Sequence, residues 1–531
     1  MLKSLLSGLL ALALGTASLA AASATGILNP LDYGAVGDGH TNNTAAFARV
    51  MAACAQAGGG TVRVPAGKYL TGSIQLVDNV TLNLEAGAEL LYSPDPADSP
   101  LVPSRYEGTN VFEHAPLIYA NGRKNIAITG RGTIDGQGQN WWWRSGSPRF
   151  APPAGRDPAP ARTAWRHLYE RIEAGEKLTA ADFTAAAEFL RPSLVQLYEC
   201  HNVLVADVTI THGPMWLLHP IYSEDVVVRG VRFISAGGGP NGDGIDVDSC
   251  RNVRISDCFF RTSDDCIVIK SGKDNDGRRT NRPTEFVTIT NCVMYEGHGA
   301  VVVGSETSGG IRNVTASNIV SEGTDTGIRI KSMRGRGGVL ENFRFDNWVI
   351  EDPKKIGFEI TMRYGRTNPE PVSARTPLFR NFAYSNITVV NAKKVATIQG
   401  LPERAVSDVR FDDINATGET GVIADHASGI EFHQVRVAVK TGSAFSFDTS
   451  EHLVFDDSAA QTADTASAAI ALRDSTDAFV RGNRAAAGTG TFLQVAGNQS
   501  GKIVLVGNDL ADASTDVALT DGAPPSAVTR K

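Results

Sequence analysis

The chain has 531 residues, 42% of them hydrophobic and 20% charged, which excludes disorder along its whole length. Its formal net charge of −7 argues against a general nucleic-acid or anionic-membrane binder. The 54 glycines follow no Gly-x-y period, so they exclude collagen and indicate many turns. Six cysteines are too few for a disulfide scaffold in so long a chain.

The N-terminus has the pattern of a secretory signal peptide. A lysine at position 3 precedes a short apolar run, and the small residues Ala22-Ser23-Ala24 provide a cleavage site. The apolar run is too short for a membrane anchor, and no later stretch reaches the roughly 20 apolar residues of a membrane-spanning helix. We therefore expect removal of residues 1–24 and a secreted or periplasmic protein without membrane contact.

Most of the remaining chain repeats a small polar residue, two or three β-forming residues, a polar spacer and a further β run. Successive spacings between the repeat centres are 23, 27, 34, 27, 29, 39, 27 and 23 residues. Periods of about 20–50 residues are typical of solenoids. The repeat centres are Val203, Val226, Val253, Val287, Val314, Phe343, Phe382, Val409 and Phe432.

These units are too short for βαβ modules and lack helical patterning. They predict an all-β fold, a right-handed parallel β-helix of about ten coils, with excess length in outer loops. We place this catalytic domain at residues 25–445. Residues 446–531 have weaker β runs and are expected to form thin terminal coils and a loose tail. We expect a monomer.

Two segments are predicted to be helical. Residues 43–56 favour a helix with Asn43 as N-cap, which would cover the open strand edge at the start of the solenoid. Residues 146–192 interrupt the repeats with several prolines and two helical stretches, 162–174 and 179–190. The second stretch begins with a possible capping box. We interpret 146–192 as an insertion between coils rather than a separate domain.

Four polar motifs recur at intervals of about one coil. From Asp243 to Asp264 is 21 residues, from Asp265 to His298 is 33, and from His298 to Arg329 is 31. Residues one coil apart in a stacked solenoid lie about 4.8 Å apart on the same side, so the motifs should converge. The motifs are Asn241-Gly242-Asp243, Ser263-Asp264-Asp265, Gly297-His298-Gly299 and Arg329-Ile330-Lys331.

Adjacent carboxylates shift one another's pKa values, so that one can keep a proton while another is ionised. This is what glycoside hydrolysis requires of its acid and its base. The neighbouring cations would suit an acidic sugar. Taken singly, an Asp pair more often binds Ca²⁺ or turn amides, Gly-His-Gly is more often a turn, and Arg-x-Lys more often a solvated strand face. Only their joint spacing favours catalysis.

In this order the motifs resemble glycoside hydrolase family 28, the polygalacturonase family, whose members carry them on a right-handed parallel β-helix. Residues 32–39 also resemble the entry motif of the wider pectin-active β-helix superfamily, and residues 134–138 with Trp141-Trp142 resemble the family. Residues 297–310 are most similar to bacterial exo-acting members. Gly242 departs from the pattern, since many fungal and plant members have Thr there.

The resemblance implies roles for individual residues. Asp264 would be the general acid, Asp243 and Asp265 would hold and activate water, and His298 would set the protonation of the acid. The implied mechanism is a single displacement with inversion, without a metal or organic cofactor. The residues implied in substrate binding are Asn241, Arg329, Lys331 and, by stacking or hydrogen bonding, Tyr364.

Further residues are weaker candidates. Lys270 follows Asp264 by six residues, an even number, so it can point to the same side and reach the cleft. Trp216 and His219 can form the wall of the cleft, although burial of such residues in the core is at least as common. Five cysteines fall on neighbouring coils, where we expect mostly buried thiols rather than essential disulfides.

The sequence therefore predicts a hydrolase of α-1,4-galacturonosidic bonds in anionic pectic polymers or oligomers. Alternatives are a family 28 enzyme acting on rhamnogalacturonan or xylogalacturonan, a Ca²⁺-dependent pectate lyase, and a non-catalytic carbohydrate-binding β-helix. We expect exo action, because the insertion 146–192 is placed to close one end of the cleft. Residues 273–282 and 304–306 would add to this wall.

Overall fold

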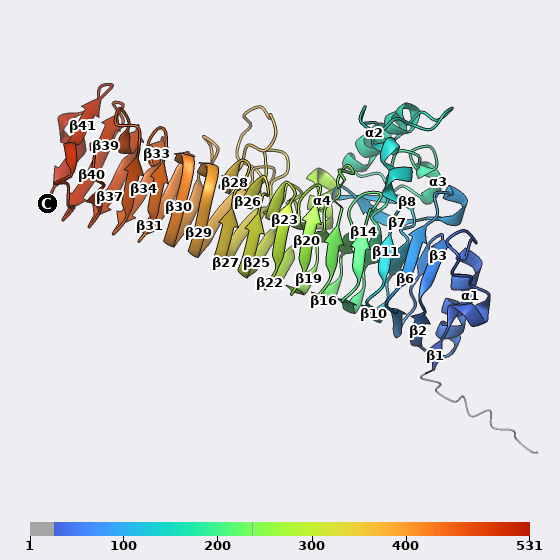
Figure 1. Cartoon of the computed structure of the whole chain (residues 1–531). Coiled ribbons are helices and arrows are strands. Elements are labelled where there is room, and N and C mark those ends of the chain that lie inside the picture. Colours follow the sequence, from blue (N-terminus) through green and yellow to red (C-terminus); the bar gives the residue numbers. More distant parts are fainter. Residues whose placement is uncertain (1–25, 236) are drawn as a thin grey trace, which may run out of the picture.

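The computed structural model describes residues 26–235 and 237–531, which stack coil upon coil into one long solenoid (Figure 1). Three parallel ladders of strands run along it, so the fold is the predicted all-β parallel β-helix. The expected signal peptide, 1–24, lies outside the described residues. Among the described residues, no helix has the length and apolar character needed to cross a membrane.

Ladder A contains the strands that carry the repeat centres of the sequence. Its members are β1 (Ile27–Leu28), β2 (Gly60–Val64), β5 (Val80–Leu84), β10 (Lys124–Gly130), β13 (His201–Ala206), β16 (Glu224–Arg229), β19 (Arg251–Ser256), β22 (Thr284–Thr290), β25 (Ile311–Glu322), β27 (Val339–Glu351), β29 (Leu378–Gln399), β30 (Val406–Asp425), β31 (Ala427–His433), β34 (Glu451–Asp456), β37 (Thr476–Arg481), β40 (Gly501–Val506) and β42 (Val528–Arg530).

Ladder B follows ladder A around each coil. The long strands β25, β27, β29 and β30 bend to join it, and its other members are β3 (Gly67–Thr71), β6 (Ala88–Tyr92), β11 (Thr133–Asp135), β14 (Thr209–Thr211), β17 (Arg232–Ile234), β20 (Phe259–Thr262), β23 (Val293–Glu296), β32 (Arg436–Val439), β35 (Ala459–Thr462) and β38 (Arg484–Ala485).

Ladder C completes each coil and carries most of the polar motifs at or next to its strands. The ends of β29 and β30 belong to it, together with β4 (Ile74–Gln75), β9 (Ile118–Asn121), β12 (Val195–Tyr198), β15 (Leu218–Ile221), β18 (Ile245–Asp248), β21 (Ile267–Lys270), β24 (Gly299–Val303), β26 (Thr326–Lys331), β28 (Ile356–Thr361), β33 (Phe445–Asp448), β36 (Ala468–Arg473), β39 (Thr489–Ala496) and β41 (Ala513–Thr520).

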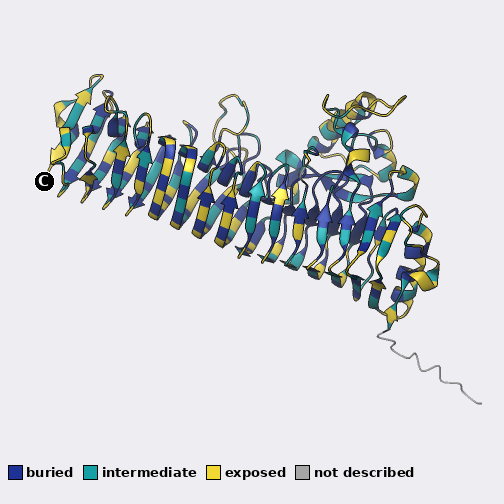
Figure 2. Cartoon of the chain, in the orientation of Figure 1, coloured by how far each residue is buried: buried dark blue, intermediate teal, exposed yellow. Residues whose placement is uncertain are grey.

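The core lies inside the coils, where every second residue of a strand points inward. Strand β5 shows the pattern, with Val80, Leu82 and Leu84 buried between partly exposed residues, and Figure 2 shows this alternation along the molecule. Equivalent residues of successive coils stack, so Phe432 lies flat between Phe411 and Phe455. Apolar burial along this interior is the main stabilising contribution.

The predicted register is confirmed over most of the repeat. Each predicted centre from Val203 to Val409 is the pairing partner of the next, through Val226, Val253, Val287, Val314, Phe343 and Phe382. The last step is wrong by two residues, because Val409 pairs with Ile430, whereas Phe432 pairs with Phe411. Both Ile430 and Phe432 point inward, and spacing alone cannot separate two such positions.

The expected loose tail is also wrong. Strands continue through β41 and β42 to Arg530, so the solenoid has more coils than the roughly ten expected. The alternating burial pattern persists in β37, with Ala478 and Val480 buried, and in β40, with Ile503 and Leu505 buried. The small inward residues of β37 weaken the sequence signal without ending the stack.

The start of the solenoid is covered by helix α1 (Thr44–Gln56), as predicted. Asn43 does not cap it through its side chain. That side chain accepts a hydrogen bond from the Val36 amide at 2.7 Å and donates to backbone carbonyls, including Leu70 O at 3.1 Å. Asn42 instead accepts from the first helical amide, that of Thr44. The buried amide of Asn43 is used to tie the entry loop to the first coils.

A satellite of helices and a hairpin stands on one side of the early coils (Figure 1). The insertion 146–192 forms α2 (Ala159–Glu173) and α3 (Ala180–Phe183), and α3 begins with the predicted capping box of Thr179 and Asp182. The predicted second helix is shorter than expected, because residues 184–189 form turns. The insertion packs on a β-hairpin of β7 (Leu101–Tyr106) and β8 (Thr109–His114), which the sequence analysis missed.

Shorter helices lie in the connections. Helix α4 (Asp274–Thr280) lies between β21 and β22, and the 3₁₀ helices are η1 (Pro30–Tyr33), η2 (Pro96–Asp98), η3 (Gly138–Asn140), η4 (Trp142–Ser145) and η5 (Pro525–Ala527).

Candidate active site

The carboxylates and the histidine of the predicted site lie in the turns that lead from ladder B to ladder C. Asp243 precedes β18, the pair Asp264-Asp265 precedes β21, and His298 precedes β24. The break in the strand that the pair was expected to need is present, since residues 263–266 lie between β20 and β21. Arg329 and Lys331 lie on β26 itself, two residues apart.

The coil register brings the four motifs together. Ile245 pairs with Ile267, and Ile267 pairs with Val301, so Asp243 and Asp265 occupy equivalent positions on consecutive coils. Asp264 and His298 are likewise equivalent, with the His298 amide donating to Asp264 O at 3.2 Å. Sequence positions 66 residues apart thus meet directly, and the Lys331 ammonium lies 2.9 Å from Asp265 Oδ2.

Glycines allow this close approach. Gly297 has a φ of +86°, and a Cβ there would meet Asp264 O at 2.4 Å. At Gly242 a Cβ would lie 2.3 Å from Ser263 Oγ, which itself donates to Gly239 O at 2.8 Å. The hydroxyl of Ser263 therefore fills the space that a larger residue at 242 would need, which gives the departure from the family pattern a local steric cause.

The carboxyl groups of Asp243, Asp264 and Asp265 form a triad, with one oxygen of each within 4.8 Å of the others. Asp243 and Asp265 are 4% and 2% exposed. His298 Nδ1 lies 2.9 Å from Asp264 Oδ1, while the rest of its ring is half exposed. Carboxylates this close can share protons, or they can hold a divalent cation.

The carboxyl groups of Asp243 and Asp264 differ in their tendency to ionise. Burial, together with the charge of Asp264, raises the pKa of Asp243 well above its ordinary value. Burial also opposes ionisation of Asp264, but the hydrogen bond and charge of His298 outweigh it, and the pKa of Asp264 is lowered. In return, the hydrogen bond to Asp264 raises the pKa of His298 above 6.5. Acid and base forms are thus separated within one cluster.

The triad opens into a cavity of about 250 Å³. Six of the predicted site residues line it: Asn241, Asp243, Asp264, Asp265, Lys331 and Tyr364. His298 and Arg329 stand beside the cavity rather than in its lining. The remaining lining residues are Glu107, Trp216, Lys270, Lys273, Ser305, Glu306 and Arg336.

Asn241 is held by an arginine that sequence reasoning did not single out. Buried Arg191, at the end of the insertion, donates to Asn241 Oδ1 at 2.7 Å and to the carbonyls of Pro214 and Pro240. Asn241 has a φ of +55°, a conformation that Asn tolerates well. The insertion therefore fixes the loop that carries Asp243.

A buried charge network supports the cavity floor. Lys270 Nζ lies 2.7 Å from Glu306 Oε2 and 3.6 Å from Asp246 Oδ1. Burial opposes the charge of Lys270, but Glu306 and Asp246 outweigh it and raise its pKa. Burial raises the pKa of Asp246, which is fully enclosed. Lys270 thus lies in the cleft, as the sequence allowed, and brings positive charge to it.

The candidate subsite residues have mixed outcomes. Trp216 lines the cavity beneath the Lys270 ammonium, 4.8 Å from its ring centre. His219 is fully buried and contacts Ser193, so it forms no part of the wall. Tyr364 is 47% exposed and lies beneath both Lys331 and Arg329, while Arg329 Nε contacts Glu359. The five cysteines on neighbouring coils are free and buried, as predicted, and Cys54 is free and buried as well.

The N-terminal end of the cavity is walled by the hairpin and helix α4. Glu107, at the hairpin turn, and Lys273, at the N-cap of α4, both line the cavity, and the Lys273 amide donates to Gly108 O at 2.9 Å. Helix α2 buttresses them, since Tyr169 donates to Asp274 and Glu173 accepts from the Asn275 amide. The insertion supports this wall without lining the cavity itself.

The sequence carried weak signals for these missed parts. Glu107-Gly108 is a two-residue turn in which both residues have positive φ, a hairpin geometry more often built from Asn-Gly or Asp-Gly. Arg105 is fully buried against Asp248 at 2.7 Å, a contact between residues 143 positions apart that no spacing rule anticipates.

Known families match two parts of the chain. Residues 181–439 match the model described as Glycosyl hydrolases family 28, and residues 27–143 match one described as rhamnogalacturonase A/epimerase, pectate lyase-like. The first match contains all four motifs. It ends at the last residue of β32, so the coils from β33 onward lie outside it.

Relatives extend the likeness over most of the chain. It is 31% identical to a probable polygalacturonase of Vitis vinifera, covering 72% of this chain and 73% of that one. It is 30% identical to an exo-poly-alpha-D-galacturonosidase of Dickeya chrysanthemi, covering 81% and 74%. The crystal structure of an exopolygalacturonase from Thermotoga maritima is 34% identical, with a TM-score of 0.68 over 75% of this chain and 90% of that one. With its acid triad in the matched coils, this chain belongs to glycoside hydrolase family 28.

Proposed function

We propose that this enzyme hydrolyses α-1,4-galacturonosidic bonds of polygalacturonate and releases galacturonic acid or a short oligomer from the non-reducing end. The observation that carries the proposal is the carboxylate triad, which shares one cavity with four cationic residues, Lys270, Lys273, Lys331 and Arg336. A neutral sugar would not need this charge, whereas a uronate is attracted by it. The names of the relatives point to the same substrate.

Asp243 and Asp265 are suited to hold the attacking water. Asp243 Oδ1 and Asp265 Oδ1 are buried and have no hydrogen-bond partner among the described residues. Two unpaired carboxyl oxygens on adjacent coils can accept both protons of one water molecule. The Lys331 ammonium donates a hydrogen bond to the other oxygen of Asp265, whereas the pKa of Asp243 is raised, so we assign the base role to Asp265 with Asp243 orienting the water.

Asp264 is assigned as the acid, although its lowered pKa would leave it ionised in the free enzyme. His298 resolves this conflict, because its raised pKa keeps a proton on the other side of a 2.9 Å hydrogen bond. A bound uronate adds negative charge beside the pair and favours moving this proton onto Asp264. From there it passes to the glycosidic oxygen as the bond to the anomeric carbon breaks.

We infer inversion, with water as the nucleophile. Carboxyl groups within 4.8 Å fall at or below the roughly 5–5.5 Å separation usual for retaining enzymes, so the distance alone argues the other way. The buried, unpaired oxygens of two carboxyl groups nevertheless favour a held water over a covalent sugar intermediate.

The substrate carboxylate is assigned to Lys331 and Arg329. Lys331 lines the cavity and Arg329 stands just outside it, and the exposed ring of Tyr364 lies under both cations. A sugar ring resting on Tyr364 would place its carboxylate between them. Asn241 also lines the cavity, and its side-chain NH₂ group can donate to a sugar hydroxyl.

Exo action is supported by the wall of hairpin and helix α4. Glu107 and Lys273 line the cavity from the hairpin turn and from the start of α4, and the hydrogen bond from the Lys273 amide to Gly108 O joins these two elements into one wall. When a cavity is blocked at one end, a polymer can enter it only with its terminus first. The pattern at residues 1–24 supports export, and we propose a secreted or periplasmic monomer.

Product analysis on polygalacturonic acid tests this function. We expect steady release of monomer or dimer, with viscosity almost unchanged and activity unaffected by EDTA. A steep fall in viscosity with a ladder of mid-sized oligomers would contradict exo action. An ultraviolet-absorbing product that requires Ca²⁺ would indicate a lyase instead.

The second candidate substrate is rhamnogalacturonan, favoured by the rhamnogalacturonase-like match of residues 27–143. Faster release of reducing ends from rhamnogalacturonan or xylogalacturonan than from polygalacturonate would select this alternative.

A further inference from the structure

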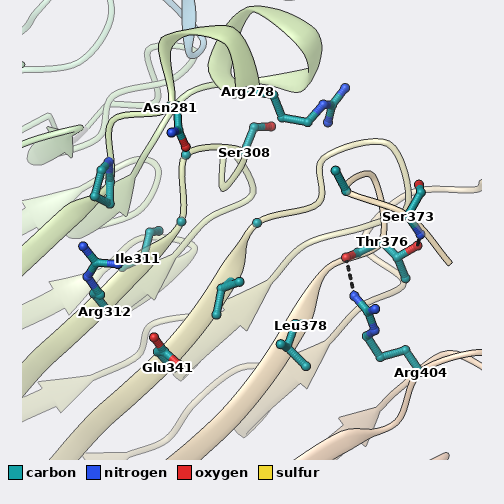
Figure 3. Close-up of a pocket in the computed structure, with 16 residues that line it drawn as sticks. Arg278, Asn281, Ser308, Ile311, Arg312, Glu341, Ser373, Thr376, Leu378 and Arg404 are labelled. Atoms are coloured by element: carbon teal, nitrogen blue, oxygen red, sulfur yellow. Dashed lines mark hydrogen bonds between the residues drawn. The ribbon is translucent and has the colours of Figure 1, made fainter.

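A second cavity of about 460 Å³ lies next to the catalytic one and shares none of its lining residues. Figure 3 shows it at the start of strands β25, β27 and β29, where the chain passes from ladder C back to ladder A. The loop 304–310 separates the two cavities. Its Ser305 and Glu306 line the catalytic cavity, and its Ser308 lines the second one.

The charges that line this second cavity do not balance. Of the four charged residues in its lining, Arg312 is paired with Glu285 and Glu341 is paired with Arg380. Arg278 and Arg404 have no ion-pair partner among the described residues, although both are partly buried. Glu341, the one carboxylate among these four residues, is thus neutralised by an arginine, and two positive charges are left over.

These two arginines are held in place rather than loosely exposed. Arg404 donates to Thr376 O at 2.9 Å, and its other N–H groups remain available for a ligand (Figure 3). Arg278 donates to backbone carbonyls at Gly335 and Arg336 and to Asn275. Burial and then the charge of Arg375 lower the pKa of Arg278, although the charges of Asp274, Glu173 and Glu370 partly oppose this shift. The carbonyl bonds fix both guanidinium groups without neutralising them.

The rest of the lining suits a sugar ring. Pro283, Ile311, Val339 and Leu378 offer an apolar surface for its C–H faces, and Ser308, Asn281 and Ser373 offer hydroxyl and amide groups for its hydroxyls. The volume lies within the roughly 300–1,000 Å³ of small-ligand sites. A small ligand that is part apolar, part hydroxylated and negatively charged matches all three properties.

We propose that this cavity is a second, non-catalytic binding site for a carboxylated sugar, with Arg404 holding its carboxylate and Arg278 adding positive charge to the lining. The choice of galacturonate as the ligand rests on the proposed function, whereas the need for an anion rests on the cavity alone. Because Arg278 and Ser308 both bond to the carbonyl of Arg336, a ligand here would contact the wall of the catalytic cavity from behind.

Calorimetric titration of the whole protein with D-galacturonate, with D-galactose as the uncharged counterpart, tests the proposal. We expect two galacturonate molecules per chain and binding at the second site at least tenfold weaker for galactose. Arg404→Gln should lose one of the two sites and keep its turnover within twofold. Val339→Trp, which fills the cavity and leaves both arginines, should lose the same site.

The matched control is Arg410→Gln, which removes the same charge from β30 outside the cavity and should keep both sites. Lys331→Ala should lose the other site. One site in the wild type, two sites in Arg404→Gln, or equal binding of galactose at the second site would overturn the proposal. A chain that retains the site lost in Arg404→Gln but hydrolyses no galacturonan would refute the proposed function and leave this inference intact.

Discussion

The catalytic coils and the C-terminal coils share one geometry but differ in what covers them. Along ladder C, Asp248 pairs with Lys270 in the catalytic region, and Asp448 pairs with Arg473 near the end of the chain. The first pair is buried and the second exposed. The same row of side chains is thus a reactive interior in one region and a solvated face in the other.

The difference lies in the loops from ladder C to ladder A. In the catalytic region, residues 271–283, 304–310 and 332–338 fill these connections, whereas residues 449–450 and 474–475 alone connect the strands in the C-terminal coils. Long loops exclude water from the strand face and so strengthen its electrostatics. The coil register thus places the groups, and the loops make them reactive.

The largest effect is expected from the triad. Asp264→Asn removes the acid and should reduce kcat by at least about 10³-fold, with Asp243→Asn and Asp265→Asn nearly as severe. Steady-state kinetics on a galacturonate oligomer measures this. Asp448→Asn is the control in the exposed region and should retain full turnover. Any triad variant above about a tenth of wild-type turnover would refute the role assigned to that residue.

The C-terminal coils should contribute stability rather than catalysis. Phe432→Ala removes a stacked core ring and should cost about 3–5 kcal/mol of unfolding free energy, with little change in kcat while the protein is folded. Denaturant unfolding measures the loss. Phe479→Ala, an outward-facing and only partly buried ring on β37, is the matched control and should cost far less. Equal losses would refute the assigned core.

The repeat could be predicted from sequence because inward β-branched and aromatic residues mark each coil. Val203 through Val409 are true pairing partners for this reason. The triad could be found as well, since its members are spaced by about one coil and flanked by glycines that permit close approach.

The features that the sequence did not predict depend on contacts that do not follow the coil repeat. Arg191 bonds to Asn241 across 50 residues, and Arg105 bonds to Asp248 across 143. The hairpin of β7 and β8 lies outside the repeat altogether. Sequence spacing describes a stack of coils, but the walls above it are set by tertiary packing.

Lys331→Ala should act mainly on binding of the charged sugar and raise KM about tenfold or more. The affinity is lost because Lys331 lines the cavity and its charge attracts the substrate carboxylate. Added salt screens this attraction, so it should weaken substrate binding more in the wild type than in the variant. Initial rates at several salt concentrations give the comparison. An unchanged KM, or equal salt dependence in both proteins, would exclude Lys331 from substrate binding.

The smallest effect concerns pH. Since its hydrogen bond to Asp264 raises the pKa of His298, the pair stabilises the fold fully below about pH 6.5, while Asp264 is ionised, and loses this contribution as pH rises through the raised value. NMR titration should therefore give His298 a pKa above 6.5. In Asp264→Asn this pKa should fall back. An unshifted histidine would remove the proton source assigned to the acid.

The most direct test of the account follows the anomeric configuration of the first product by proton NMR, as the wild-type enzyme cleaves a short galacturonate oligomer. Water held by Asp243 and Asp265 predicts that an α-linked substrate first yields the β-anomer, which then mutarotates. Initial release of the α-anomer would mean a covalent intermediate, and would contradict the roles assigned to Asp243 and Asp265.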